Sequence, residues 1–490
     1  MTLVAGIDSS TQSCKVVVQD SGTGALVRTG KASHPDGTEI HPSHWWDALS
    51  KALADGGGLA DVAALAVAGQ QHGMVLLDAA GTVLREALLW NDTRSAGSAE
   101  DLVAELGAAA LAARTGSVPV ASFTITKVRW VRDNEPDIAG RVAAVALPHD
   151  WLTWRLRGYG PAEESPLGPD LQELVTDRSD ASGTGYWSPA GNRYDLALFE
   201  HALGRPAREA APGQAPAPNT VILPRVAGPA ETVGTVHPSL AGGTAGILLG
   251  AGAGDNAGAA LGLGAVTGDV VVSLGTSGTV YAVTETPATD ATGTVAGFAD
   301  ASGSFLPIAV TLNAARVLGT TAALLGVSLD EFASLALAAE PGSAGVVLLP
   351  YFEGERTPNL PEAKASFHGL SMASTTRENL ARAAVEGMLC SLAAGLAAIL
   401  DQGITARRLL LIGGAAQNPA VQAIAAQVFD LPVQVPAPGE YVARGAAVQA
   451  AWLLGGTRPD WPQPGLPAPA PDHRPVIKEQ YDAVAGAIYG

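Results

Sequence analysis

Two strand–turn–strand units stand about half a chain apart in this sequence, and both consist of an apolar strand, a polar turn and a second apolar strand. In the first unit, the runs Val4–Ile7 and Cys14–Gln19 flank the turn Asp8–Ser13, and Ala25–Thr29 continues the pattern. The second unit occupies Asp269–Thr284, where the runs VVVSL and TVYAV flank GTSG. The repetition predicts a β-meander in each of two domains of related design.

Chain length also favours two domains. Single hydrophobic cores stop growing at about 250–300 residues, and this chain has 490. Strand-like segments alternate with helix-like ones such as Ala381–Leu400 and Gly445–Leu454, which indicates α/β folds with sheets covered by helices. We place the boundary near Ala241, which gives domains of residues 1–240 and 241–490. Proline, which lacks an N–H donor, predicts a surface loop at Arg205–Pro218 and an irregular tail at Gly465–Arg474 before a last short helix.

Composition and charge exclude several classes of function. With 47% hydrophobic and 16% charged residues, the chain has the composition of a soluble globular protein. Its net charge of −18 disfavours nucleic acid and anionic membranes as partners. The apolar stretch Gly246–Leu263 contains Asp255, which disfavours a membrane span. Cys14 and Cys390 form no disulfide framework, and the N-terminus has no signal-peptide pattern, so we expect a cytoplasmic protein.

Three small-residue turns are candidate phosphate or nucleotide sites. Asp8–Gln12 and Ser273–Thr279 each lie between two strands, where backbone N–H groups can bind phosphate. Both could also be ordinary hairpin turns. Gly413–Asn418 follows the apolar strand Leu409–Ile412, and the end of a parallel strand is a common ligand site. Asp8 would repel phosphate directly, so its useful role there is to hold Mg²⁺ through water.

Two polar segments are candidates for substrate binding. Asp255 lies between an apolar strand and an Ala-rich helix, where it could be a helix N-cap or a base that accepts a hydroxyl proton. Gly69–Met74 and Trp90–Arg94 combine Gln, His, Trp, Asn, Asp and Arg. Such a mixture of donors, acceptors and one aromatic face suits a polyhydroxy ligand, although a lone His beside a strand is more often structural.

These segments, in this order, resemble the FGGY carbohydrate kinases. Ser122–Asn134 is similar to the first signature of that family, with Lys127 and Trp130 in place. Ala365–Leu370, followed by Asn379-Leu380 and Ala383–Glu386, is similar to the second signature. The resemblance runs from Asp8 to about Ala451, which is nearly the whole chain.

The resemblance implies two ribonuclease-H-like domains of the actin/hexokinase type around a catalytic cleft, with ATP and Mg²⁺ as cofactors. It implies Asp255 as the general base and Asp8 and Asp255 as the metal carboxylates. The implied substrate-binding residues are Gln71, His72, Asp255, Asn256, Trp90 and Arg94, and the implied nucleotide-binding residues are Ser10, Thr11, Gln12, Gly275, Thr276, Ser277, Gly413, Gly414, Ala415 and Asn418.

Within the family, Gly69–Gly73 and Leu89–Arg94 look most like xylulokinases, which would make D-xylulose the substrate and D-xylulose 5-phosphate the product. Kinases of L-ribulose, gluconate, L-fuculose or a polyol are the alternatives. A non-catalytic sugar- or ATP-binding regulator is a further alternative, but it predicts loss of the base or of a phosphate turn, and both are present. Analogy to relatives suggests a homodimer.

Overall fold

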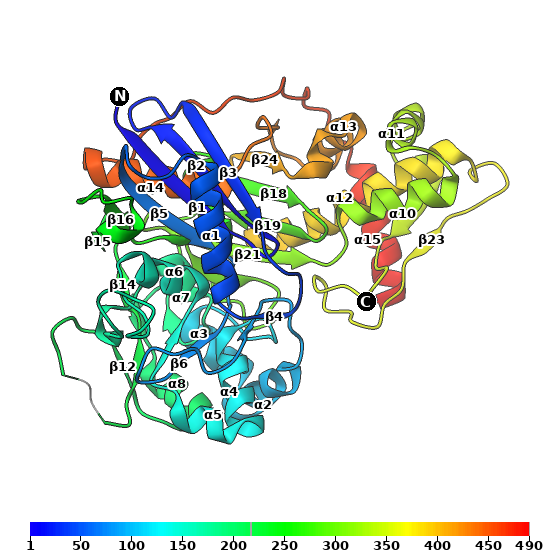
Figure 1. The fold of residues 1–490 in the computed structure, drawn as a ribbon. Coiled ribbons are helices and arrows are strands. Elements are labelled where there is room, and N and C mark those ends of the chain that lie inside the picture. Colours follow the sequence, from blue (N-terminus) through cyan, green and yellow to red (C-terminus); the bar gives the residue numbers. More distant parts are fainter. Residues whose placement is uncertain (216–217, 490) are drawn as a thin grey trace.

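The computed structural model describes residues 1–215 and 218–489, and within them two α/β domains each contain a mixed sheet (Figure 1). The first sheet has the order β15-β16-β5-β1-β2-β3, with β17 also paired to β5. Its strands are β1 (Leu3–Ser9), β2 (Ser13–Asp20), β3 (Leu26–Ser33), β5 (Val62–Gly69), β15 (Thr232–Thr235), β16 (Leu248–Gly250) and β17 (Ala253–Gly254). Strand β1 pairs antiparallel with β2 and parallel with β5.

The second sheet repeats this design. Its order is β20-β21-β19-β18-β24-β25. Strand β18 pairs antiparallel with β19 and parallel with β24, as β1 does with β2 and β5. The strands are β18 (Asp269–Leu274), β19 (Gly278–Ala282), β20 (Ala296–Ala299), β21 (Phe305–Thr311), β24 (Arg408–Ile412) and β25 (Val433–Gln434). The two domains of related design, and the actin/hexokinase-type fold, are therefore confirmed.

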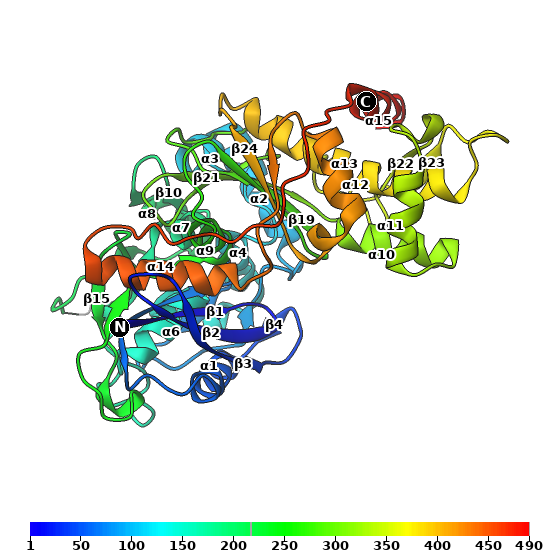
Figure 2. The same ribbon diagram turned by 90° about the horizontal axis from the view of Figure 1, so that it is seen from above.

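Helix α14 (Tyr441–Gly455) crosses back from the C-terminal part of the chain to the first sheet, where it packs on β1, β5 and α9 (Asp255–Gly262). Figures 1 and 2 show this orange helix beside the blue strands. The approach is so close that a Cβ at Gly6 would lie 1.8 Å from the Ala443 carbonyl oxygen. Glycine in β1 is thus a condition for this packing.

The second sheet packs against α12 (Arg377–Leu400), whose N-cap Thr376 accepts a hydrogen bond from the Asn379 amide. By length and composition alone, this helix could span a membrane, but 78% of its apolar window is buried inside the protein. Helices α10 (Ala315–Leu325) and α11 (Leu329–Ala338) could together form one further span, although they are bent by 89°. Buried core helices of soluble proteins have the same length and apolar composition, so these segments are weak evidence for a membrane span.

The remaining elements surround the two sheets. In the first domain they are α1 (Ser43–Asp55), α2 (Ala96–Leu106), α3 (Ala108–Thr115), α4 (Thr124–Asn134), α5 (Pro136–Arg141), α6 (Pro148–Leu156), α7 (Arg178–Ser182), α8 (Leu196–Leu203), and the short strands β4 (Glu39–Ile40), β6 (Val75–Leu77), β7 (Ala87–Leu88), β8 (Ala144–Ala146), β9 (Val175–Asp177), β10 (Trp187–Ser188), β11 (Arg193–Tyr194), β12 (Ala207–Glu209), β13 (Val221–Leu223) and β14 (Arg225–Ala227). In the second they are α13 (Pro419–Val428), α15 (Pro475–Tyr489), β22 (Val347–Leu349) and β23 (Ser366–His368).

The predicted loop at Arg205–Pro218 is wrong in one part. Strand β12 lies inside it and pairs with β13, because neither Ala207 nor its two successors is a proline and their N–H groups remain available. Residues 216–217 of this stretch lie outside the described residues. The irregular tail Gly465–Arg474 is confirmed, but α15 after it has 15 residues and is not short.

The division at Ala241 remains a prediction. Strands β16 and β17 follow this residue, yet both pair with β5 in the first sheet. The first sheet therefore continues to Gly254, immediately before Asp255.

Candidate active site

A cavity of about 280 Å³ lies between the domains. Its first-domain wall includes Gln71, His72 and Phe123, and its second-domain wall includes the turn Gly275–Ser277. Predicted site residues that line it are Gln71, His72, Trp90, Asp255, Asn256, Gly275, Thr276 and Ser277. The sequence segments chosen for chemistry thus converge on one space.

Parallel strand ends explain the first-domain wall. Strands β1, β5 and β17 lie in register, with Ser9 opposite Gly69 and Gly69 opposite Gly254. The residues that follow these strands, including Gln71 and Asp255, therefore emerge at the same edge of the sheet. Ligands of open α/β sheets bind at such an edge.

The second-domain wall has the same origin. Strands β18 and β24 are parallel, with Ser273 opposite Ile412, so the turns Gly275–Ser277 and Gly413–Ala415 leave the sheet side by side. Gly413 has φ +97°, and a Cβ there would lie 2.5 Å from the Leu274 carbonyl oxygen. Asn418 caps α13 by accepting a hydrogen bond from the Ala420 amide at 2.9 Å.

The other predicted residues lie beside the cavity and not in its lining. The Thr11 hydroxyl accepts a hydrogen bond from Trp90 Nε1 at 2.9 Å, which joins the first phosphate turn to the wall. Ser10 donates to the Ser13 carbonyl at 2.9 Å within the same turn, beside Gln12. Arg94 points elsewhere: its guanidinium pairs with Asp92 at 2.8 Å and with Glu39 at 3.1 Å.

Asp255 begins α9, and Gly254 occupies the N-cap position, so the N-cap alternative does not apply. Its Oδ1 accepts hydrogen bonds from the Asn256 amide at 2.7 Å and from Asn256 Nδ2 at 3.0 Å. Burial raises the pKa of Asp255 to about 6, and the Asn256 bonds oppose that shift. Such a carboxylate is ionised near pH 7 and basic enough to accept a proton from a positioned hydroxyl.

Asp8 is buried, and its Oδ1 has no hydrogen-bond partner among the described residues. Burial raises its pKa to about 7; the Lys15 charge opposes this shift, and Asp255 and Glu440 add to it. The Lys15 Nζ atom lies 2.6 Å from Glu440 Oε2, with which it forms an ion pair. An orphaned buried carboxylate oxygen close to a second carboxylate fits a hard divalent cation such as Mg²⁺, which binds oxygen ligands.

His72 is held in one tautomer. Its Nδ1 lies 2.6 Å from the Gly183 carbonyl oxygen, so Nδ1 carries the proton and Nε2 is an acceptor. Burial, and then the Lys127 charge, lower the pKa of His72 to about 3, which keeps the ring neutral. The ring packs against Phe123 and Phe298, with centroid distances of 4.9 and 5.7 Å.

Lys127 fixes the backbone of His72, a role that sequence reasoning missed although the signature containing Lys127 was recognised. Its Nζ donates to the carbonyl oxygens of His72 and Ser122, at 2.8 Å each. His72 has φ +67°, a conformation that a side chain rarely adopts without support. The lysine therefore holds the substrate wall in a strained but defined conformation.

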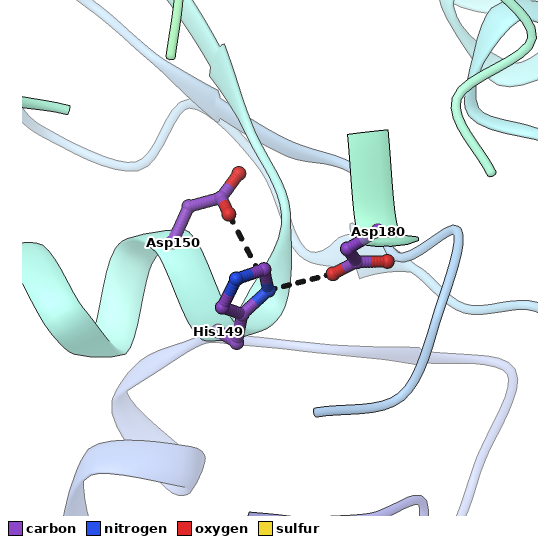
Figure 3. Close-up of side chains that lie close together, drawn as sticks. All are labelled: His149, Asp150 and Asp180. Atoms are coloured by element: carbon purple, nitrogen blue, oxygen red, sulfur yellow. Dashed lines mark hydrogen bonds and ion pairs between the residues drawn. The ribbon is translucent and has the colours of Figure 1, made fainter. Parts of the chain in front are cut away.

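A buried ion cluster lies behind this wall and was also missed. His149 Nδ1 lies 2.7 Å from Asp180 Oδ2 and 3.4 Å from Asp150 Oδ1, and Figure 3 shows its ring between the two carboxylates. Burial alone would lower the pKa of His149, but Asp150, Asp180 and Asp177 outweigh it and raise the pKa to about 10. His149, Asp150 and Asp180 could coordinate a cation. The 2.7 Å contact is instead a charge-assisted hydrogen bond from a protonated ring.

The cluster connects to the cavity through α7. Asp177 Oδ2 accepts from Ser179 Oγ at 2.6 Å, and that hydroxyl accepts from the Gly254 amide at 3.0 Å. The Ser179 carbonyl accepts from Gln71 Nε2 at 3.2 Å. The residue before Asp255 and one wall residue are therefore both anchored to a single serine.

Comparisons with known proteins agree with this geometry. Residues 3–262 match the N-terminal domain of the FGGY family of carbohydrate kinases, and residues 270–454 match its C-terminal domain. The chain belongs to the FGGY family of carbohydrate kinases. It is 47% identical over 465 residues to a xylulose kinase of Streptomyces rubiginosus, covering 93% of this chain and 89% of that protein. The Escherichia coli xylulose kinase is 34% identical, with 84% and 82% covered.

Solved structures of sugar kinases superpose on nearly the whole chain. The xylulose kinase from Bifidobacterium adolescentis superposes with a TM-score of 0.90 at 47% identity, covering 99% of each chain. A gluconate kinase from Lactobacillus acidophilus has a TM-score of 0.85 at 20% identity, covering 100% of this chain and 99% of that one. That second likeness concerns the fold alone.

The role of His72 can be tested by a substitution at that residue. If Nε2 accepts a sugar hydroxyl, His72→Ala should weaken D-xylulose use by about 10–100-fold and reduce discrimination between pentuloses and polyols, because a polar mismatch is costly. The ATP KM should change little. Substrate-panel kinetics and the melting temperature measure these effects.

His72→Asn and His201→Ala are the controls. Asparagine tolerates a positive φ, and the exposed His201 ring contacts Glu105, neither of which lines the cavity. A destabilised His72→Ala protein with unaltered relative preferences would mean that the ring is only a packing residue.

Proposed function

We propose that this protein transfers the γ-phosphoryl group of ATP to D-xylulose and forms D-xylulose 5-phosphate. One observation carries the proposal: a single cavity contains both a partly desolvated carboxylate, Asp255, and a small-residue phosphate turn, Gly275–Ser277. The names of relatives that are 47% identical over most of the chain support D-xylulose as the sugar.

In the proposed reaction, Asp255 orients the C5 hydroxyl of the sugar and accepts its proton. The oxygen attacks the γ-phosphorus in line, and ADP leaves. Phosphoryl transfer depends mainly on positioning and charge neutralisation. The backbone N–H groups of Ser10–Gln12 and Gly275–Ser277 supply fixed dipoles toward the phosphates.

Asp8 and Asp255 would hold Mg²⁺, and the orphaned Asp8 oxygen supports this assignment. When bound, the metal neutralises charge on the phosphate oxygens. Gly413–Asn418, beside the second phosphate turn, would bind the adenosine part of ATP. Closure of the two domains would exclude water, the competing acceptor.

His72 Nε2, Gln71 and Asn256 would bind sugar hydroxyls, with Trp90 as an aromatic wall. Arg94 would not touch the sugar. Its ion pairs with Asp92 and Glu39 would instead hold the segment that carries Trp90 in place. The cytoplasm is the expected location, and both cysteines are free and buried. A homodimer remains an expectation by analogy.

A substrate panel with coupled ADP detection tests the proposal. The panel contains D-xylulose, L-ribulose, L-fuculose, gluconate, xylitol and glycerol. D-xylulose should give the highest kcat/KM. A higher value for another compound would replace D-xylulose as the substrate, and no ADP release with any of them would favour a non-catalytic binding protein.

A further inference from the structure

Arg356 is a charged cavity residue that none of the roles above uses. It lies in the loop between β22 and β23 and lines the cavity together with His72 and Asp255. Its side chain comes from the second domain, whereas His72 comes from the first. The residue is half-buried.

Its guanidinium has no hydrogen bond or ion pair to any residue in the described part of the chain. Burial lowers the pKa of Arg356, and no carboxylate counters that effect. Arg316 behaves differently, since it pairs at 2.5 Å with Glu353 of the same loop. A guanidinium presents five N–H donors, so a desolvated and unpaired one calls for acceptors from a ligand.

The carboxylate next to it in sequence is committed elsewhere. Glu355 accepts hydrogen bonds from the Leu312 amide at 2.6 Å and from Asn313 Nδ2 at 3.0 Å. Asn313 Nδ2 also donates to the Gly354 carbonyl at 2.8 Å. Backbone hydrogen bonds in both directions join Glu355 to Leu360, at 2.9 and 2.8 Å. The loop is therefore fixed, and the Glu355 carboxylate does not neutralise Arg356.

Arg356 acts on one end of the cavity. Its positive charge is among the causes that lower the pKa of His72, after burial and Lys127. Asp255 lines the same cavity, but its side-chain hydrogen bonds come from Asn256 and not from Arg356. The transferred phosphoryl group must meet Asp255, so we assign Arg356 to oxygens of the sugar that lie farther from the reacting hydroxyl.

We propose that Arg356 is a specificity-determining residue that donates hydrogen bonds to the substrate oxygens most remote from the phosphorylated hydroxyl. For D-xylulose these are the C1 hydroxyl and the C2 carbonyl oxygen. The inference rests on the proposed function above. A sugar bound in this way contacts both domains at once, so its binding also favours closure of the cleft.

The test compares wild type, Arg356→Met and Arg356→Lys on D-xylulose and on 1-deoxy-D-xylulose, which lacks the C1 hydroxyl. A hydrogen bond to a charged group is stronger than one between neutral groups. We therefore expect Arg356→Met to lose about 10–100-fold in kcat/KM on D-xylulose and clearly less on the deoxy sugar. Arg356→Lys, which keeps the charge without the planar fork, should be intermediate.

Arg316→Met is the matched control, because Arg316 of α10 pairs with Glu353 of the same loop but does not line the cavity, so both sugars should be unaffected. Melting temperatures show whether each variant is folded. An equal loss on both sugars, a raised ATP KM with unchanged sugar selectivity, or no loss at all would overturn the role of Arg356. If wild type itself fails to prefer D-xylulose in this panel, the proposed function fails, whatever the variants do.

Discussion

Asp255→Asn is expected to lower kcat for sugar phosphorylation by about 10²–10⁴-fold, the usual contribution of a general base. Asparagine has nearly the same shape and can still accept the hydrogen bond that the Asn256 amide now donates to Asp255 at 2.7 Å. It cannot take up the hydroxyl proton. Coupled ADP release measures the rate, and calorimetric titration with D-xylulose shows whether the sugar still binds.

The pH dependence of kcat/KM gives a second test, because a purely structural role of Asp255 would not affect it. The base acts only when deprotonated, and burial raises the pKa of Asp255 to about 6. At saturating Mg²⁺, kcat/KM of wild type should therefore fall as the pH decreases through about 6, and the residual activity of Asp255→Asn should lack this acid limb. Near-wild-type turnover in the folded variant would remove Asp255 from the role of base.

Asp8→Asn is expected to raise the Mg²⁺ concentration needed for half-maximal activity and to lower the maximal rate by about 10²-fold, since metal charge stabilisation supplies several kcal/mol. The reason is the buried Asp8 Oδ1, which has no partner among the described residues, together with the charge of Asp255, which acts on Asp8. A Mg²⁺ titration at fixed ATP measures both quantities.

The melting temperature distinguishes a metal-binding role of Asp8 from the role of an ordinary turn residue. Burial raises the pKa of Asp8 from its ordinary value to about 7, so its charged form is disfavoured in the fold. Removal of that charge should leave the metal-free melting temperature equal or higher. Asp20→Asn, at the end of β2, is the control. An unchanged Mg²⁺ requirement together with an unchanged rate would make Asp8 an ordinary turn residue.

The sequence was most informative for candidate site residues that directly follow a strand. The turns at Asp8–Gln12 and Ser273–Thr279 were recognisable because each separates two apolar runs, and the parallel pairing of β1 with β5 and β18 with β24 brings the other segments to the same edges. Local pattern and the family resemblance together therefore predicted two related domains and eight of the 20 residues that line the cavity.

The rest depends on contacts between distant parts of the chain. Helix α14 can pack on β1 because residues such as Gly6 are small, and single small residues form no recognisable sequence pattern. His149 and Asp180 form one cluster only after α6 and α7 pack together. Arg356 looks like any loop arginine in the sequence. Only the structure shows that its neighbour Glu355 accepts a hydrogen bond from Asn313 and that the guanidinium has no partner among the described residues.

The most direct measurement is the ³¹P NMR spectrum of the product formed from ATP, Mg²⁺ and D-xylulose, with Asp255→Asn as the matched control. We expect a new phosphate monoester signal, split by the two protons on C5, that grows with ADP and is nearly absent with the variant. Formation of ADP with inorganic phosphate but no sugar ester, or an ester on another carbon, would contradict this expectation.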